Sequence, residues 1–278
     1  MTRSWLVVLC AACGSHASTA PRSPVTATAK LPDGPPLVTA GERMSYRLSL
    51  QGLELATYDL GVGEVTELGG KQAIVVQSHA KTVGLGAIIR VDDYFSSWID
   101  VATGRPLRWV TDEFASDSPN KEKTDADLAA RSGDTLPIMF HINNEPPKPE
   151  PQKVTLADVW DYNAFLVALR SWEGPPGTTI VIEVLRSRFL WHVEMRIRGK
   201  DKVVTELGEF PALRFDAHTY KLGRDGTRAK DSDERDFSIW ISNDDGRVPL
   251  QIVAKTDYGD IKMKLVDYQP GTGKRLRN

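Results

Sequence analysis

Apolar and polar residues alternate along most of the chain after about residue 41, a pattern that is typical of β-strands. The clearest run covers residues 188–198, in which only Leu190 breaks the alternation. Its apolar positions are Phe189, Trp191, Val193, Met195 and Ile197. Successive side chains of a strand point to opposite faces, so this run predicts a strand with one buried face.

Three further runs near the C-terminus, at 237–241, 248–254 and 261–265, show the same alternation. Segments rich in Asn, Asp and Gly separate them, at 243–246 and 257–260, and such residues favour tight turns. The three runs therefore predict an antiparallel meander. Similar alternation occurs at 44–50, 91–101, 107–109, 180–184 and 213–215. The chain is expected to be mainly antiparallel β.

One segment has helical rather than strand spacing. Thr155 and Asp158 are spaced as a capping box, and the following apolar residues fall on one helical face: Val159, Tyr162, Leu166 and Leu169. The Gly-Pro-Pro-Gly run at 174–177 predicts the end of the helix. Because a helix with one apolar face must bury it, we expect a curled antiparallel sheet or partial barrel packed against this helix. A β-sandwich is the alternative.

The N-terminus has the layout of a secretory signal peptide over residues 1–12, with Arg3 followed by a short apolar run. Cys13 follows two alanines, which resembles the lipidation site of bacterial lipoproteins, although Cys10 stands where such sites usually carry Leu. We therefore expect cleavage before Cys13 and a lipid anchor on that residue. The alternatives are a plain secretory signal or an unexported chain. Both cysteines of the chain, Cys10 and Cys13, lie in this segment, so no disulfide is expected in the domain.

Composition divides the rest of the chain. Residues 13–40 are rich in Ala, Ser, Thr and Pro and predict an extended tether, 41–270 a single mainly β domain, and 271–278 a flexible basic tail. The formal net charge of -2 gives no field that would attract nucleic acid. The expected location is the cell envelope, facing the periplasm, with the membrane as partner through the N-terminal lipid.

Four stretches carry a family resemblance: 41–47, 90–100, 168–170 and, most specifically, 236–250 with its Trp-Ile-Ser-x-Asp-x-x-x-x-Pro arrangement. They resemble the bacterial family named domain of unknown function 3108. The resemblance implies an exported, mainly β envelope protein, often a lipoprotein, and it implies no agreed activity. It covers most of the chain after the predicted tether.

Motifs for catalysis and cofactor binding are missing from the sequence. There is no Walker loop, no Gly-x-Ser-x-Gly and no His-Glu-x-x-His, and no cofactor or metal is expected. Asp244 and Asp245 are the candidate catalytic carboxylates, although Asp-Asp-Gly is also a common hairpin turn. The acidic run at 231–236 is interspersed with basic residues and is interpreted as a solvated loop.

Large aromatic side chains occupy the predicted second face of the sheet. Tyr94 and Trp98 alternate with the apolar positions of their strand, and Trp240 does so in another. Beside polar groups such as Arg247, these rings could form a platform for sugars or a lining for an acyl chain. Alternatively, the helix packs there and buries them as a second core. Exposure of the rings distinguishes the two.

Two hypotheses for function remain. The first is a non-enzymatic envelope lipoprotein that binds or chaperones a lipid, glycan or protein through the concave face of the sheet. The second is an envelope hydrolase that acts on glycans or esters with Asp244 or Asp245.

Overall fold

A computed structural model describes residues 25–83, 90–115, 118, 120–230, 232 and 234–277. Its one helix among these residues is α1 (Tyr162–Leu169). The strands of the N-terminal half are β1 (Arg43–Leu50), β2 (Leu53–Leu68), β3 (Lys71–Thr82), β4 (Asp92–Asp100), β5 (Pro106–Phe114), β6 (Lys121–Asp127), β7 (Thr135–Leu136), β8 (Ile138–Ile142), β9 (Lys148–Pro149) and β10 (Gln152–Lys153). Those that follow are β11 (Val159–Asp161), β12 (Thr179–Arg186), β13 (Phe189–Thr205), β14 (Gly208–Lys221), β15 (Arg235–Ser242), β16 (Pro249–Thr256) and β17 (Gly259–Gln269).

Almost all strands belong to one sheet, in the order β11-β12-β13-β14-β15-β16-β17-β1-β2-β3-β4-β5-β6-β8-β9. Neighbouring strands are antiparallel except β11 and β12, which are parallel. β1 pairs with β17, so the first and last of these strands lie side by side in the middle of the sheet. The sheet therefore extends from this central pair in both directions, one half made by β1 to β6, β8 and β9 and the other by β11 to β17, while β7 and β10 form a separate two-stranded sheet. The predicted C-terminal meander is confirmed by β15, β16 and β17.

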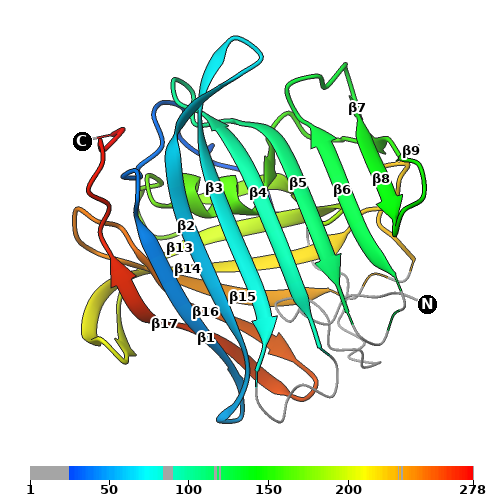
Figure 1. Ribbon diagram of the computed structural model, residues 1–278. Helices are drawn as coiled ribbons and strands as arrows, with labels where there is room; N and C mark the ends of the chain where they lie inside the picture. The colour runs from blue at the N-terminus through cyan, green and yellow to red at the C-terminus, as the bar shows by residue number, and fades with distance from the viewer. Residues whose placement is uncertain are drawn as a thin grey trace.

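This topology forces the sheet to curl. The two edge strands β9 and β11 are joined by residues 150–158, a link that can span at most about 35 Å. In a flat sheet of this order, the same two edges would lie about 67 Å apart, at roughly 4.8 Å for each strand spacing. The sheet must therefore bend its edges toward each other, as Figure 1 shows. The prediction of a mainly β, curled antiparallel sheet against one helix is confirmed.

Helix α1 lies inside this curl, between the two halves of the sheet (Figure 1). Every residue from Asn163 to Leu169 is buried, so the whole helix, and not one face, is enclosed. It contacts β3 and β4 on one side and β11 and β12 on the other. Because the helix touches both halves, it fills the concave interior that the curl creates.

The predicted start of the helix is wrong. Asp161 is the N-cap, and its carboxylate accepts a hydrogen bond from Ala164 N at 2.8 Å. Thr155 instead donates its hydroxyl hydrogen bond to Glu183 of β12, and Val159 begins the short strand β11. Thr155 therefore bonds to the buried carboxylate of Glu183 and does not cap the helix. The chain stays extended through β11 before α1 begins.

Part of the segment predicted as an extended tether packs against the domain. Leu31 and Val38 are each only 1% exposed and belong to the main hydrophobic core. Thr28 N donates a hydrogen bond to Thr179 O at the edge of β12. Burial of these apolar side chains holds the segment against the domain, so the part of the predicted tether from Thr28 to Ala40 is packed.

The predicted flexible tail is likewise packed. Leu276 N donates to Val38 O at 3.0 Å, and Gly273 N donates to Ala40 O at 3.0 Å. Gly271 makes this approach possible, since a Cβ at that position would lie 2.3 Å from Ala40 O. The tail and the pre-domain segment therefore bind each other. The predicted signal peptide and the lipid site at Cys13 lie outside the described residues.

A second, smaller core lies where β5, β6 and β8 meet β12 and β13. Leu190, the residue that breaks the alternation in its strand, is fully buried there with Trp109, Leu185 and Leu222. Trp109 donates a hydrogen bond to Ser187 O at 3.1 Å, across the junction of the two halves. No helix in the described part of the chain has the length and hydropathy to cross a membrane.

Candidate ligand-binding pocket

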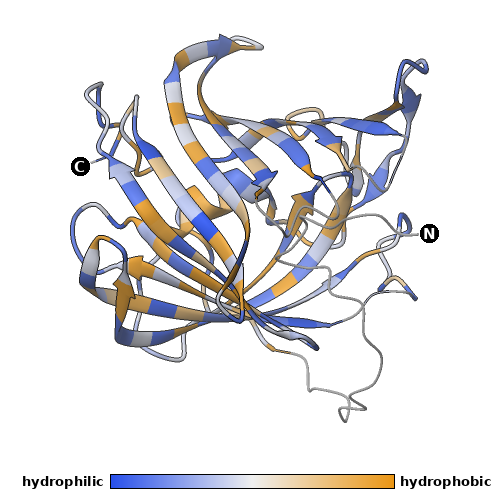
Figure 2. Ribbon diagram, turned by 60° about the horizontal axis from the view of Figure 1, so that its bottom comes forward, coloured by the Kyte–Doolittle hydropathy of each residue, from blue (hydrophilic) through white to orange (hydrophobic). Residues whose placement is uncertain are grey.

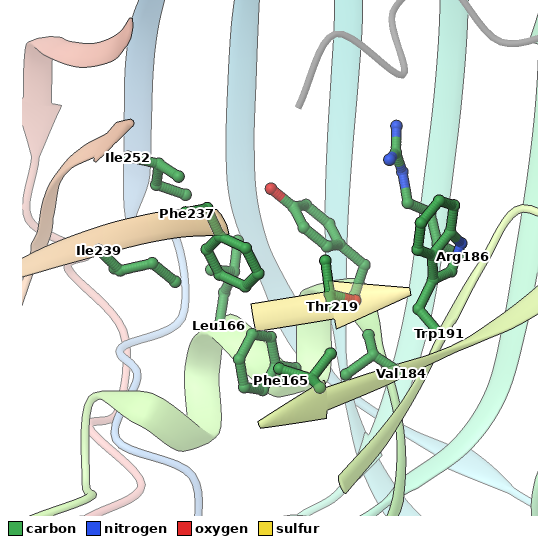
Figure 3. Close-up of a pocket in the computed structure, with 11 residues that line it drawn as sticks. Phe165, Leu166, Val184, Arg186, Trp191, Thr219, Phe237, Ile239 and Ile252 are labelled. Carbon is green, nitrogen blue, oxygen red and sulfur yellow. The ribbon is translucent and has the colours of Figure 1, made fainter. Parts of the chain in front are cut away.

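An apolar pocket lies on the concave side of the sheet, between α1 and the strands β12 to β16. The space between these elements, open solvent included, amounts to about 510 Å³. Its lining comes from one helix and five strands: Tyr162, Phe165, Leu166, Val184, Arg186, Trp191, Val193, Thr219, Phe237, Ile239 and Ile252. Figure 3 shows how these side chains converge.

Alternation in the strands explains why these side chains meet. Phe237 and Ile239 are two residues apart on β15, and Trp191 and Val193 are two apart on β13, so each pair points to the same face. Colouring by hydropathy shows bands of apolar and polar residues alternating along strands of the sheet (Figure 2). The helix contributes Phe165 and Leu166 from the opposite wall.

Buried polar contacts fix the helix wall of the pocket in position. Asn163 donates to Val76 O of β3 at 3.2 Å, and its amide oxygen accepts from Ser78 at 2.9 Å. Ser97 of β4 donates to the N-cap carboxylate Asp161 at 2.6 Å. These contacts attach α1 to β3 and β4, on the side of the helix away from the pocket. The helix is therefore fixed on one side and lines the pocket on the other.

The C-terminal end of α1 is held by a buried ion pair. Arg170 donates to both carboxylate oxygens of Glu42, each at 2.8 Å, and to Gly246 O at 2.8 Å. Their side chains are 5% and 2% exposed. Tyr268 also donates to Glu42, at 3.0 Å, and its own pKa is raised to about 12, mainly by burial. Glu42, directly before β1, thus anchors the helix end, and Tyr268 of β17 supports Glu42.

Arg186 is the charged residue among those that line the pocket. It ends β12, two residues after Val184, and so faces inward. In Figure 3 its guanidinium lies at the end of the group away from Phe237 and Ile252. Its Nη1 is buried and has no hydrogen-bond partner among the described residues. The pocket therefore has an apolar body and one cationic end.

Two buried carboxyl groups lie within electrostatic range of Arg186. Burial, together with the nearby Glu113, raises the pKa of Asp93 on β4 to about 8. Burial also raises the pKa of Glu113 on β5, while hydrogen bonds from Ser187 and Thr111 oppose that shift. In both cases the positive charge of Arg186 lowers the pKa by less than burial raises it. Asp93 is consequently largely protonated at neutral pH and provides little counter-charge.

The sequence-predicted residues Tyr94 and Trp98 lie on the convex face, opposite to the helix. Their neighbour Ser97 points inward to Asp161, so alternation places the two rings outside. Tyr94 is 52% exposed and stacks on His79 with ring centroids 4.1 Å apart. The Trp98 ring is partly exposed and packs under Arg108. The helix does not pack on this face, contrary to the second-core interpretation.

Trp240 lies elsewhere on the same sheet, on β15, with five strands between it and β4. It is buried, at 9% exposure, and donates to Asp201 at 2.8 Å while Arg214 covers its ring. Because Phe237 and Ile239 face the pocket, Trp240 faces away from it. The three predicted aromatic residues therefore do not form one platform.

The remaining predicted residues belong to the turn between β15 and β16. Arg247 is buried and donates to Arg170 O and Trp172 O, both at 2.9 Å, which caps the carbonyl end of α1. Asp244 accepts from Ser242 and from the backbone N of Gly246 and Arg247. The backbone oxygen of Asp245 accepts from Arg275. The polar contacts of the Asp244 carboxylate thus lie within the turn, where they hold its backbone in place.

Sequence reasoning missed Arg186, and a signal for it was present. Ile180, Ile182 and Val184 occupy every second position of β12, and Arg186 continues that parity with a charged side chain. A charge at an inward position marks a candidate functional residue because burying it alone is costly. Within the described ranges, no group of three or more His, Cys, Asp or Glu side chains is placed to hold a metal ion.

Together, the curled sheet, the inner helix and the apolar pocket define a barrel-like β-protein with a pocket on the concave side of its sheet. The model of the family "Protein of unknown function (DUF3108)" matches residues 44–266, so the chain belongs to the domain of unknown function 3108 family, as the sequence resemblance indicated. No curated protein matches the sequence.

Solved structures with a similar fold are distant in sequence. A β-barrel-like protein of the domain of unknown function 1849 from Brucella abortus matches with a TM-score of 0.51 and 10% identity, over 84% of this chain and 99% of that one. A candidate exported protein with a YmcC-like fold from Bacteroides fragilis gives a TM-score of 0.40 and 10% identity, over 86% and 99%. A candidate lipoprotein from Parabacteroides distasonis gives 0.33 and 8%, over 87% and 100%. The first supports the barrel-like fold.

Proposed function

We propose that the protein is a non-enzymatic component of the cell envelope that binds the hydrocarbon chain of a lipid in the pocket on the concave face of its sheet. The observation that carries this proposal is the apolar cavity between α1 and β12 to β16. The signal-like N-terminus and Cys13 support export and attachment to a membrane.

The chemistry of the lining favours a lipid over the other two ligands considered. A glycan is recognised through many hydrogen-bonding groups, whereas Phe165, Leu166, Phe237, Ile239 and Ile252 offer none. A hydrocarbon chain gains from the same surface about 25 cal/mol for each Å² removed from water. The aromatic rings proposed for sugar binding lie outside this cavity.

Binding of the neutral apolar dye N-phenyl-1-naphthylamine tests this proposal, because its fluorescence rises on leaving water. We expect saturable binding to the full chain, and displacement of the dye by dodecanol. Val184→Phe places a larger ring at a cavity-lining position that is 4% exposed, so it should weaken binding at least tenfold.

Tyr94→Ala provides the matched control, since it removes an aromatic ring from the convex face. It should leave the affinity for the dye unchanged. The proposal fails if dye binding is absent or non-saturable, or if Tyr94→Ala reduces it while Val184→Phe, folded by circular dichroism, does not.

A further inference from the structure

The pocket contains one guanidinium at the end of an otherwise apolar lining, and we infer that its ligand is a single-chain amphiphile whose anionic end group is bound by Arg186. This inference rests on the proposed function and adds the identity of the head group. The apolar body holds the chain, and Arg186 holds the terminal carboxylate or phosphate. Both groups present two or more oxygens that a guanidinium can bind with parallel hydrogen bonds.

The first argument is the state of the Arg186 side chain. Its Nη1 is shielded from solvent without a hydrogen-bond partner among the described residues, and the carboxyl groups of Asp93 and Glu113 interact with its charge only electrostatically. Removing a charged donor from water without a partner is strongly unfavourable. An anionic ligand would supply the missing acceptor.

Two buried arginines of the same interior have acceptors for the terminal nitrogens of their guanidinium groups, although Nε of Arg170 is also buried without a partner. Arg170 has a bidentate carboxylate partner and a backbone carbonyl. Arg247 donates to two backbone carbonyls. Both therefore act within the fold, whereas the Nη1 group of Arg186 has no such role. This contrast separates Arg186 from a residue that serves only to hold the structure.

Three titratable groups interact with the charge of Arg186: Asp93, Glu113 and Tyr58. Burial raises the pKa of all three. Tyr58 is neutral at physiological pH, and Asp93 is largely so. Asp93 and Tyr58 therefore contribute little negative charge at this end of the pocket. Long-range attraction would favour a negatively charged head group over a neutral one.

Displacement of N-phenyl-1-naphthylamine by ligands of one chain length tests the inference on the full chain at pH 7.5. Dodecanoate represents a free fatty acid, dodecyl phosphate a phosphate head group, and dodecanol the same chain without charge. For the wild type, we expect at least one of the two anions to displace the dye at a concentration at least tenfold below that of dodecanol. The stronger anion identifies the source of the head group.

Arg186→Gln should abolish this preference, raising the displacing concentration of the anion about tenfold to a hundredfold and leaving that of dodecanol unchanged. Arg186→Lys keeps the charge and should retain part of the preference, which also covers the case in which Arg186→Gln does not fold.

The possible failures are distinguishable. If the dye binds and dodecanol displaces it, but neither anion is preferred by the wild type, the inference is wrong and the proposed function stands. An anion preference that persists in Arg186→Gln would also overturn it. If the dye does not bind at all, the proposed function itself fails.

Discussion

The N-cap of α1 makes the stability of the fold dependent on pH. Asp161 is fully buried, and burial raises its pKa from 3.8 to about 7, although hydrogen bonds from Ala164 and Ser97 lower it in part. The perturbation that isolates this group is Asp161→Asn. Asn is about as good an N-cap as Asp and cannot ionise, so it mimics the protonated carboxyl.

The sign and size follow from linkage between protonation and folding. Because the folded pKa lies above the unfolded one, the folded state holds a proton between pH 4 and 7 that the unfolded state has released. The stabilisation is therefore complete below about pH 4 and is lost as the pH rises through 7. A difference of about three pH units at about 1.4 kcal/mol each gives a loss of about 4 kcal/mol.

Urea unfolding followed by tryptophan fluorescence at pH 4.5 and pH 8 measures this effect. We expect wild type and Asp161→Asn to have similar free energies of unfolding at pH 4.5, and the variant to be the more stable one at pH 8 by up to about 4 kcal/mol. Asp93 contributes in the same direction to both proteins, since its pKa is raised to about 8, and so cancels in the difference. An Asp161→Asn variant that is equally less stable than the wild type at both pH values would refute the reasoning.

Three further predictions concern the helix end, the tail and the anchor. Arg170→Met leaves the Glu42 carboxylate buried without its cation and should lower the free energy of unfolding by about 3–5 kcal/mol, whereas adding Glu42→Gln should restore part of it; additive losses in urea unfolding would contradict this. Gly271→Ala places a Cβ 2.3 Å from Ala40 O and should cost about 1–3 kcal/mol and increase amide exchange at Leu276; unchanged exchange would argue against the packed tail. The mature N-terminus should be a lipidated Cys13 by mass spectrometry, and Cys13→Ala should release the protein from membranes; a different start or an unmodified cysteine would rule out the anchor.

Much of the fold could be predicted because its strands have one apolar and one polar face. The meander of β15 to β17 follows directly from alternation and turn residues. β2 and β3 were not predicted, although they form the longest hairpin of the N-terminal half. On β3, Ser78 occupies an inward position because it bonds to Asn163 of the helix, and a polar residue there weakens the alternation. Interior polar contacts thus hide strands from pattern analysis.

The site could not be predicted to the same extent, because cavity lining and solid core have the same sequence pattern. Trp191 and Val193 were recognised as inward-facing, but nothing local tells whether the space beside them is filled. That depends on where α1 lies, and its position is set by long-range contacts such as Asn163 with Val76. The sequence pattern instead favoured exposed aromatic residues such as Tyr94 as binding residues, since rings beside polar groups are common in binding sites.

The topology explains why a pocket remains inside the curl. The link from β9 to β11 brings the sheet edges together, but polar contacts through Asp161, Asn163 and Arg170 attach α1 to β1 to β4 and to the strand ends beside them. Hydrogen bonds of Arg170 and Arg247 also attach the C-terminal end of α1 to the turn between β15 and β16, whereas the body of the helix offers β12 to β16 only Phe165 and Leu166, which pack without directional bonds. A helix fixed by hydrogen bonds on one side cannot move to close a gap on the other. The space against β13 to β16 is therefore retained by the same contacts that stabilise the interior, and substitutions at Asn163 should alter the pocket without touching its lining.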